Sequence, residues 1–293
     1  MIDLFNYERR KSSVTHVGAL DMGGDNPVRI QSMTTTDTND TEASVAQAKR
    51  IIAAGGELVR LTTQGKREAE NLKHINAQLR SEGITTPLCA DVHFNANVAD
   101  VAALYAEKVR INPGNYVDPG RTFKILEYTD EEYAKELKKI EERLTPFINI
   151  CKENHTAVRI GVNHGSLSDR IMSRYGDTPE GIVESCMEFL RIFKKHDFND
   201  VVISIKASNT VVMVRSVRLL VAEMEKEGMN YPLHLGVTEA GEGEDGRIKS
   251  AVGIGALLND GIGDTIRVSL SEEPECEIPV AKYLTRYIRQ KKG

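Results

Sequence analysis

The sequence predicts an α/β protein with a (β/α)8 TIM-barrel fold, and three observations carry this prediction. Short β-branched runs that end in turn residues alternate with stretches whose apolar residues recur at helical spacing. Eight such strand–helix units follow one another, and most of them start about thirty residues after the previous one. An arginine recurs inside several of the predicted strands. The regular count favours the barrel over a doubly wound sheet.

The chain before the first barrel strand is predicted to form a separate small element. Residues 14–21 and 23–27 have the pattern of a hairpin, so we expect residues 1–27 to plug the bottom of the barrel. The barrel is expected over residues 28–272. Residues 273–293 are expected to form a C-terminal helix.

Each predicted strand is a short run, too β-branched or too brief for a helix, that is followed by turn residues. The first ends at Met33-Thr34, and the third ends at Asp91-Val92-His93. The eight predicted strands occupy residues 28–33, 58–61, 88–92, 108–111, 157–162, 201–205, 233–237 and 265–268.

The helices are predicted from apolar spacing and from residues that start or stop a helix. Thr41 is expected to cap the first helix. Thr129 and Glu132 form a predicted capping box ahead of the longest helix, and Pro146 within that pattern indicates a kink or a new start. Residues 163–177 are expected to form a loop.

Composition narrows the range of functions. The chain has 293 residues and a net charge of -5, which gives no electrostatic support for nucleic-acid binding. Residues 1–12 lack the apolar core of a signal peptide, and no stretch is long enough to span a membrane. We therefore expect a cytoplasmic protein that binds neither nucleic acid nor membrane.

The four cysteines are Cys89, Cys151, Cys186 and Cys276, and they are widely separated without a Cys-x-x-Cys pair. This spacing argues against a zinc or iron–sulfur site made by these residues alone. We expect buried, reduced thiols and no metal ligands in this chain.

The recurring arginine indicates an anion site. Arg60, Arg110, Arg159 and Arg267 each lie within an apolar strand, and an arginine is rarely buried without a partner. Barrel enzymes build their sites at the carboxyl ends of the strands. The candidate site residues there are Arg60, Asp91, His93, Arg110, Asn112, Arg159, Asn163, Lys206, Ser208, Glu239, Arg267 and Ser269.

These candidates carry more positive than negative charge. Cations cannot converge in a confined site without counter-charge, and Asp91 and Glu239 offset two of them at most. A multiply charged anion would offset the rest, and guanidinium groups match phosphate geometry. The loop at residues 241–246 resembles a phosphate loop, but its acidic residues weaken that interpretation.

Several motifs in register resemble one enzyme family. They are Gln31-Ser32-Met33-Thr34, Ala90-Asp91-Val92-His93-Phe94, the runs at 109–115 and 159–167, Ser204-Ile205-Lys206-Ala207-Ser208, Gly236-Val237-Thr238-Glu239-Ala240-Gly241, and the run at 261–270. From about residue 10 to 272 the chain is similar to the N-terminal barrel of the 4-hydroxy-3-methylbut-2-enyl diphosphate synthases of the non-mevalonate isoprenoid pathway. Residues 163–172 and the long insert after Asn115 resemble the three-domain, plant-type form. This resemblance implies that the helix at residues 273–293 leads to a middle domain and an iron–sulfur domain.

The resemblance implies a reaction. These iron–sulfur oxidoreductases reductively open 2-C-methyl-D-erythritol 2,4-cyclodiphosphate, with two electrons from ferredoxin or flavodoxin and loss of a hydroxyl. Their [4Fe–4S] cluster is held by three cysteines and a glutamate of a C-terminal domain, which closes over the barrel across a homodimer. This sequence has no such cysteine triad. The chain alone is therefore expected to bind the diphosphate and to catalyse nothing.

The resemblance also implies a role for each candidate residue. Arg60, Arg110, Arg159, Lys206 and Arg267 would hold the diphosphate, and Asn112, Asn163, Ser208 and Ser269 would add hydrogen bonds. Asp91 and His93 would orient that lining. Glu239 would face the reacting carbons and donate a proton as the hydroxyl leaves.

Three other functions stay open from the sequence. Lys206 at a strand end would suit a Schiff-base aldolase acting on a phosphosugar. A pterin-dependent synthase barrel also binds a diphosphate among arginines and asparagines at its strand ends. The chain would otherwise be only a ligand-binding module.

Overall fold

A closed parallel barrel forms the centre of the molecule. The computed structural model describes residues 6–238 and 240–290, with only the backbone for 288–290. Eight parallel strands pair in the order β8-β7-β6-β5-β4-β3-β10-β9. A bridge between Ile203 of β8 and Leu233, directly before β9, joins the two edges of the sheet. The predicted (β/α)8 barrel is confirmed. Its strands are β3 (Arg29–Met33), β4 (Leu58–Thr63), β5 (Leu88–Val92), β6 (Lys108–Ile111), β7 (Ala157–Asn163), β8 (Val201–Lys206), β9 (His234–Leu235) and β10 (Thr265–Ile266).

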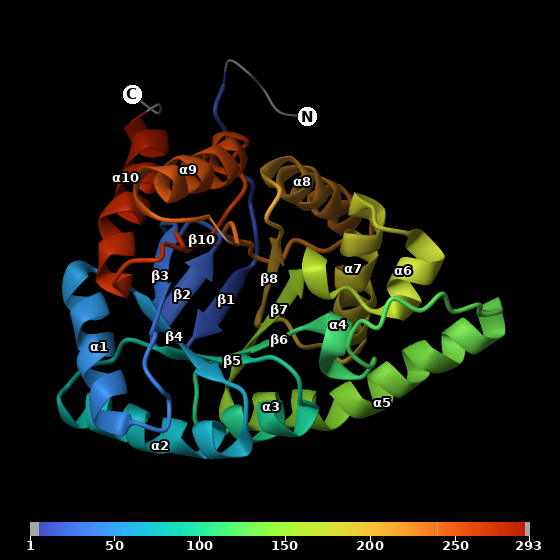
Figure 1. Ribbon diagram of the computed structural model, residues 1–293, viewed down its shortest axis with the longest axis horizontal. Helices are drawn as coiled ribbons and strands as arrows, with labels where there is room; N and C mark the ends of the chain where they lie inside the picture. Colours follow the sequence, from blue (N-terminus) through green and yellow to red (C-terminus); the bar gives the residue numbers. More distant parts are fainter. Residues whose placement is uncertain (1–5, 239, 291–293) are drawn as a thin grey trace.

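Helices surround the strands, as Figure 1 shows. Side-chain oxygens that accept backbone amides cap several of them, as expected for helix starts. The longer helices are α1 (Thr41–Ala54), α2 (Lys66–Ser81), α3 (Ala96–Ala102), α5 (Asp130–Asn154), α7 (Pro179–Lys195), α8 (Thr210–Lys226), α9 (Gly243–Asn259) and α10 (Glu277–Gln290). Shorter turns are α4 (Pro113–Tyr116), η1 (His164–Ser166), α6 (Asp169–Tyr175) and η2 (Pro274–Cys276).

The structure corrects several local predictions. Asp40, not Thr41, caps α1, because its carboxylate accepts an amide of the first turn at 3.0 Å. Helix α5 continues through Pro146, so no new helix starts there. The predicted loop after β7 contains η1 and α6, and Ser168 caps α6. Paired β structure in β9 and β10 is shorter than predicted, although the Arg267 amide still donates to the Leu235 carbonyl at 3.0 Å.

An antiparallel hairpin closes the N-terminal end of the barrel. It consists of β1 (Val14–Val17) and β2 (Leu20–Gly23). Val17 and Met22 are fully buried, and they pack against the first inward-facing side chains of four strands: Leu58, Cys89, Ala157 and Val202. This apolar layer forms the floor beneath the polar interior.

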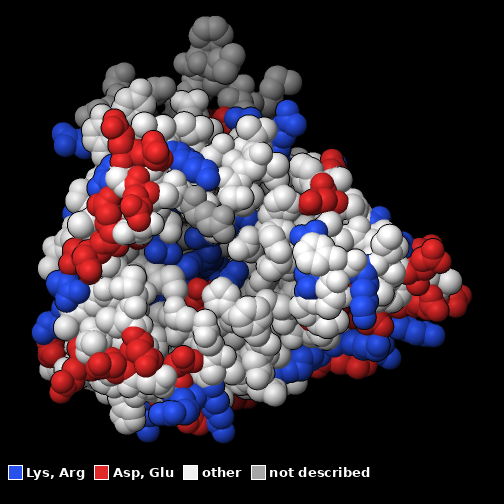
Figure 2. Space-filling view, in the orientation of Figure 1, with Lys and Arg blue, Asp and Glu red and all other residues white. Residues whose placement is uncertain are grey.

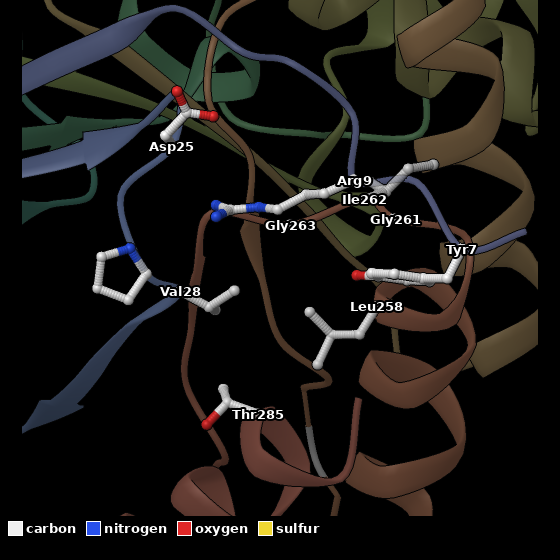
Figure 3. A pocket seen from close by; sticks show the side chains of 10 residues that line it. Tyr7, Arg9, Asp25, Val28, Leu258, Gly261, Ile262, Gly263 and Thr285 are labelled. Atoms are coloured by element: carbon white, nitrogen blue, oxygen red, sulfur yellow. The ribbon is translucent and has the colours of Figure 1, made fainter. Parts of the chain in front are cut away.

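A cavity lies beside this closed end. Tyr7 and Arg9 from the N-terminal segment, Leu258 from α9 and Thr285 from α10 line it together with the chain just before β3 and β10 (Figure 3). Arg9 pairs there with Asp264 at 2.8 Å. Because the cavity lies at the amino ends of the strands, it is separate from the charged interior described below.

The strands divide their side chains between two environments. Successive residues of a strand point to opposite faces, and the outward set packs with the helices in the main apolar core. In most barrels of this type branched apolar side chains also fill the interior. Here most inward positions above the floor are polar or charged: Gln31, Arg60, Asp91, Lys108, Arg110, Arg159, Ser204, Lys206, His234, Thr265 and Arg267.

Candidate functional site

Basic side chains gather at a hollow in the molecule. Figure 2 shows Lys and Arg atoms at the base of a hollow near the centre of the face, with a carboxylate beside them. The basic residues of the barrel interior are Arg60, Lys108, Arg110, Arg159, Lys206 and Arg267.

Asp91 of β5 is the carboxylate around which several of these groups meet. Its side chain lies 3.3 Å from Arg60 Nε and 3.1 Å from Arg110 Nη1. Burial alone would raise the pKa of the Asp91 carboxyl, but the charges of Arg60 and Arg110 hold this pKa well below its usual value. Asp91 is therefore ionised and fixes the two guanidinium groups.

His93 continues the same network at the mouth. Its Nε2 lies 3.1 Å from Asp91 Oδ2, and its Nδ1 lies 3.4 Å from Arg110 Nη1. One tautomer fits both contacts, with Nε2–H donating to Asp91 and Nδ1 accepting from Arg110. The contact joins His93 to Asp91, and the orienting role of this pair stays a prediction.

Arg110 packs against the neighbouring strand β7. Its Nη2 donates to the Gly161 carbonyl at 2.9 Å. A Cβ on Gly161 would lie only 2.4 Å from Arg110 Nε, so any larger residue there would displace the guanidinium. The glycine is thus part of how β7 positions Arg110.

Arg159 is the most deeply buried of the predicted arginines. Only 1% of it is exposed, and its Nε donates to Ser204 Oγ at 2.9 Å. Its Nη1 is buried without a hydrogen-bond partner among the described residues. Burial, followed by the charges of Arg60 and Arg110, lowers the pKa of Arg159 well below its ordinary value. Among the described residues, this guanidinium therefore has an unused donor and no carboxylate in ion-pair contact.

Two lysines add to the positive charge. Burial, followed by the charges of Arg60, Arg159 and Arg267, lowers the pKa of Lys206 well below its ordinary value. Lys108 is fully buried, its Nζ lies 3.3 Å from Gln31 Oε1, and burial first of all lowers its pKa to about 8. No ion pair with a carboxylate is found for either lysine within residues 6–238 and 240–287.

Arg267 has a partner that the sequence reasoning missed. Its Nε and Nη2 each lie 3.2 Å from a carboxylate oxygen of Glu277, in the first turn of α10. Burial lowers the pKa of Arg267, and the charge of Glu277 opposes that shift. No motif points to Glu277, because it lies outside the strand–helix units.

The remaining predicted residues lie around the mouth. Asn112 donates from Nδ2 to Ser166 Oγ at 2.8 Å, and Asn163 accepts the Gly165 amide at 3.2 Å. Ser208 is exposed after β8, and Ser269 is half-buried after β10. The predicted catalytic residue, Glu239, lies outside the described residues.

The described residues do not fit a metal cluster. No group of three or more His, Cys, Asp or Glu side chains among them could hold a metal ion. Cys151 and Cys186 are buried, and burial raises the pKa of both thiols, which disfavours the thiolate that a metal requires. Within the described part of the chain, no helix combines the length and apolarity that crossing a membrane requires.

The fold and its interior define a TIM-barrel protein with a cluster of cations inside the barrel. The family comparison is more specific: residues 12–282 match the family described as GcpE TIM-barrel domain, and the chain belongs to that family.

Curated relatives agree with this assignment. The chain is 77% identical over 292 residues to a protein of Phocaeicola vulgatus named 4-hydroxy-3-methylbut-2-en-1-yl diphosphate synthase (flavodoxin), with 100% of this chain and 48% of the relative covered. A Porphyromonas gingivalis protein of the same name is 58% identical over 293 residues, covering 100% of this chain and 50% of the relative. These matches confirm the resemblance, and the chain spans about half the length of the curated relatives it matches.

Solved structures show the fold alone. A Xanthomonas albilineans dihydropteroate synthase has a TM-score of 0.55 at 12% identity, covering 96% of this chain and 98% of that one. An N-acetylneuraminic acid synthetase from Leptospira borgpetersenii has a TM-score of 0.59 at 11% identity, covering 98% and 92%.

Proposed function

We propose that this chain is the substrate-binding barrel of an iron–sulfur reductase that converts 2-C-methyl-D-erythritol 2,4-cyclodiphosphate to 4-hydroxy-3-methylbut-2-enyl diphosphate. The names of the relatives support the product. The observation that carries the proposal is the unbalanced charge of the barrel interior. Arg159 and Lys206 are buried there without a carboxylate partner among the described residues, and a diphosphate supplies the missing charge.

The positions of the described side chains support the binding roles, and the role of Glu239 rests on the family resemblance. Arg60, Arg110, Arg159, Lys206 and Arg267 hold the two phosphates, and guanidinium forks favour this geometry. Asp91 keeps Arg60 and Arg110 in place. Further hydrogen bonds come from Asn112, Asn163, Ser208 and Ser269, and Glu239 donates the proton to the leaving hydroxyl.

The reduction requires electrons that these residues do not carry. A [4Fe–4S] cluster supplies them when bound, and we expect its ligands in a C-terminal domain, as the resemblance implies. The printed names of the relatives support flavodoxin as the electron donor. We infer a cytoplasmic homodimer in which the cluster-bearing part faces the mouth of the barrel.

Titration calorimetry with the cyclodiphosphate tests the binding role. We expect saturable binding to this chain, weakened at least about tenfold in Arg159→Ala, since a charged hydrogen bond is worth about 1.5 kcal/mol or more. Arg191→Ala is the matched control, because Arg191 pairs with Glu227 on the outer surface of α7. Absence of binding, or equal losses in both variants, would contradict the proposal.

The lowered pKa of Lys206 also favours one competing reaction, a Schiff-base aldolase. Borohydride treatment with carbonyl phosphosugars distinguishes the two functions. A covalent mass increase located at Lys206 would support the aldolase. We expect none, because the cations around Lys206 suit a bound diphosphate.

A further inference from the structure

Glu277 is a buried carboxylate that enters the site from outside the barrel strands. Only 2% of the residue is exposed. Its Oε1 accepts from Arg267 Nη2 at 3.2 Å and from the Leu270 amide at 3.1 Å. Its Oε2 accepts from Arg267 Nε at 3.2 Å and from Ser32 Oγ at 2.8 Å. Both oxygens are therefore fully engaged with groups from β3 and from the chain after β10.

These contacts determine how Arg267 is presented. Glu277 takes one edge of the guanidinium, Nε and Nη2, and leaves Nη1 outside the ion pair. Nη1 lies 3.5 Å from Met33 Sδ, a weak acceptor that also contacts Arg60 Nη2 at 2.9 Å. Nη1, the part of the guanidinium that Glu277 does not hold, thus lies on the side of Arg60.

Without the Glu277 carboxylate, the position of Arg267 beside the other cations would be electrostatically unfavourable. The charges of Arg267 and Arg60 both lower the pKa of Lys206, so these groups repel one another across the interior. A flexible arginine side chain that is repelled by its neighbours moves toward solvent, where its charge is hydrated. The pairing with Glu277 opposes this movement.

We propose that Glu277 is a positioning residue of the anion site, which holds Arg267 against the repulsion of its neighbours and so makes α10 a functional part of the barrel. The proposal rests on the proposed function in one respect, namely that Arg267 contacts a diphosphate. It adds a residue, and a helix, that the strand-end motifs do not include.

A double-mutant cycle with inorganic pyrophosphate as the probe tests this role. We expect Glu277→Gln to weaken pyrophosphate binding by about fivefold, a coupling of the size seen between residues in contact. In an Arg267→Ala background the same change should have no further effect, because Glu277 acts through Arg267. If Glu277 contributed only to folding, Glu277→Gln would lower the free energy of unfolding equally in both backgrounds. Its effect on pyrophosphate binding would then not depend on Arg267.

Glu275→Gln provides the matched control. Glu275 lies two residues earlier and pairs with Arg50 on the surface at 2.9 Å, so this variant should bind like the wild type. Unchanged binding in Glu277→Gln, or an equal loss with and without Arg267, would overturn the proposal. If Glu277→Gln does not fold, Glu277→Asp keeps the charge but shortens the reach, and the same cycle and the same two outcomes apply.

The proposed function fails separately from this inference. If wild-type chain does not bind pyrophosphate, or if Arg159→Ala binds it as tightly as the wild type, the anion site itself is wrong. If Arg159→Ala loses pyrophosphate affinity as expected while Glu277→Gln binds like the wild type, only the role of Glu277 is contradicted.

Discussion

At the scale of single residues, one carboxylate organises a group of cations. Asp91 holds Arg60 and Arg110 directly and contacts His93 at the mouth. Arg159 and the lysines are left without such a partner among the described residues. A buried charge without a partner costs several kcal/mol, so natural sequences retain such an arrangement where a ligand needs it.

Lys108 is a residue that the sequence could have revealed. It stands two positions before Arg110 on the same short strand, so both side chains point to the same face. Because Lys108 begins its strand, attention to strand ends alone does not include it. Glu277 could not be found in this way, because its contact with Arg267 depends on how α10 packs.

Lys108 leads to a prediction about pH. We expect affinity for the cyclodiphosphate to fall as the pH rises through about 8, because burial above all lowers the pKa of Lys108 to about 8 and its positive charge is lost there. Calorimetric titrations on both sides of that pH measure the fall. Lys108→Met should lack this step, and an equal fall in that variant would assign the titration to another group.

The same pKa predicts the opposite trend for stability. The pKa of a lysine in the unfolded chain is about 10.4. Between about pH 8 and 10.4 the unfolded chain therefore binds more protons than the folded chain. The contribution of Lys108 to the free energy of unfolding therefore rises with pH in that window. Urea unfolding measures this trend: as the pH rises through that window, the free energy of unfolding of the wild type should increase relative to that of Lys108→Met.

At the scale of elements, local signals predicted most of the barrel. The β-branched runs located the eight strands, and Thr129 and Glu132 form the predicted capping box of α5. The errors are local: α5 continues through Pro146 where a new helix start was one expectation, and α6 is too short to show a clear periodicity. The ends of β9 and β10 depend on pairing with neighbouring strands, and the sequence of one strand alone does not determine that pairing.

The contact between β6 and β7 gives an element-level prediction. Gly161→Ala should destabilise the chain by about 1 to 3 kcal/mol and weaken diphosphate binding, because the new Cβ would lie 2.4 Å from Arg110 Nε. Thermal unfolding and calorimetry measure the two effects. Gly255→Ala on α9 is the control: its Cβ would meet nothing within 4 Å, so a helical alanine should stabilise by about 0.5 to 1 kcal/mol. Wild-type binding in Gly161→Ala would show that Arg110 can move without loss.

At the scale of the whole molecule, the sign of the charge differs between interior and surface. The chain carries a net charge of -5, yet the described barrel interior is rich in Lys and Arg. Overall charge therefore gave no hint of an anion site, and the recurring strand arginines did. Stability and ligand binding make opposite demands on these interior cations, because repulsion among them favours unfolding until an anion is bound.

This opposition predicts the behaviour of Arg159→Met. Without ligand the variant should be more stable than the wild type by about 1 to 2 kcal/mol, because an apolar side chain of similar length replaces a buried charge whose Nη1 has no partner among the described residues. With cyclodiphosphate at about a hundred times its Kd, the wild type should gain about 2.7 kcal/mol, while the variant gains much less. Thermal unfolding with and without ligand therefore gives a reversal of the stability order. If the variant is less stable than the wild type in the absence of ligand, Arg159 stabilises the folded barrel itself. It is then not a charge that only a bound anion compensates.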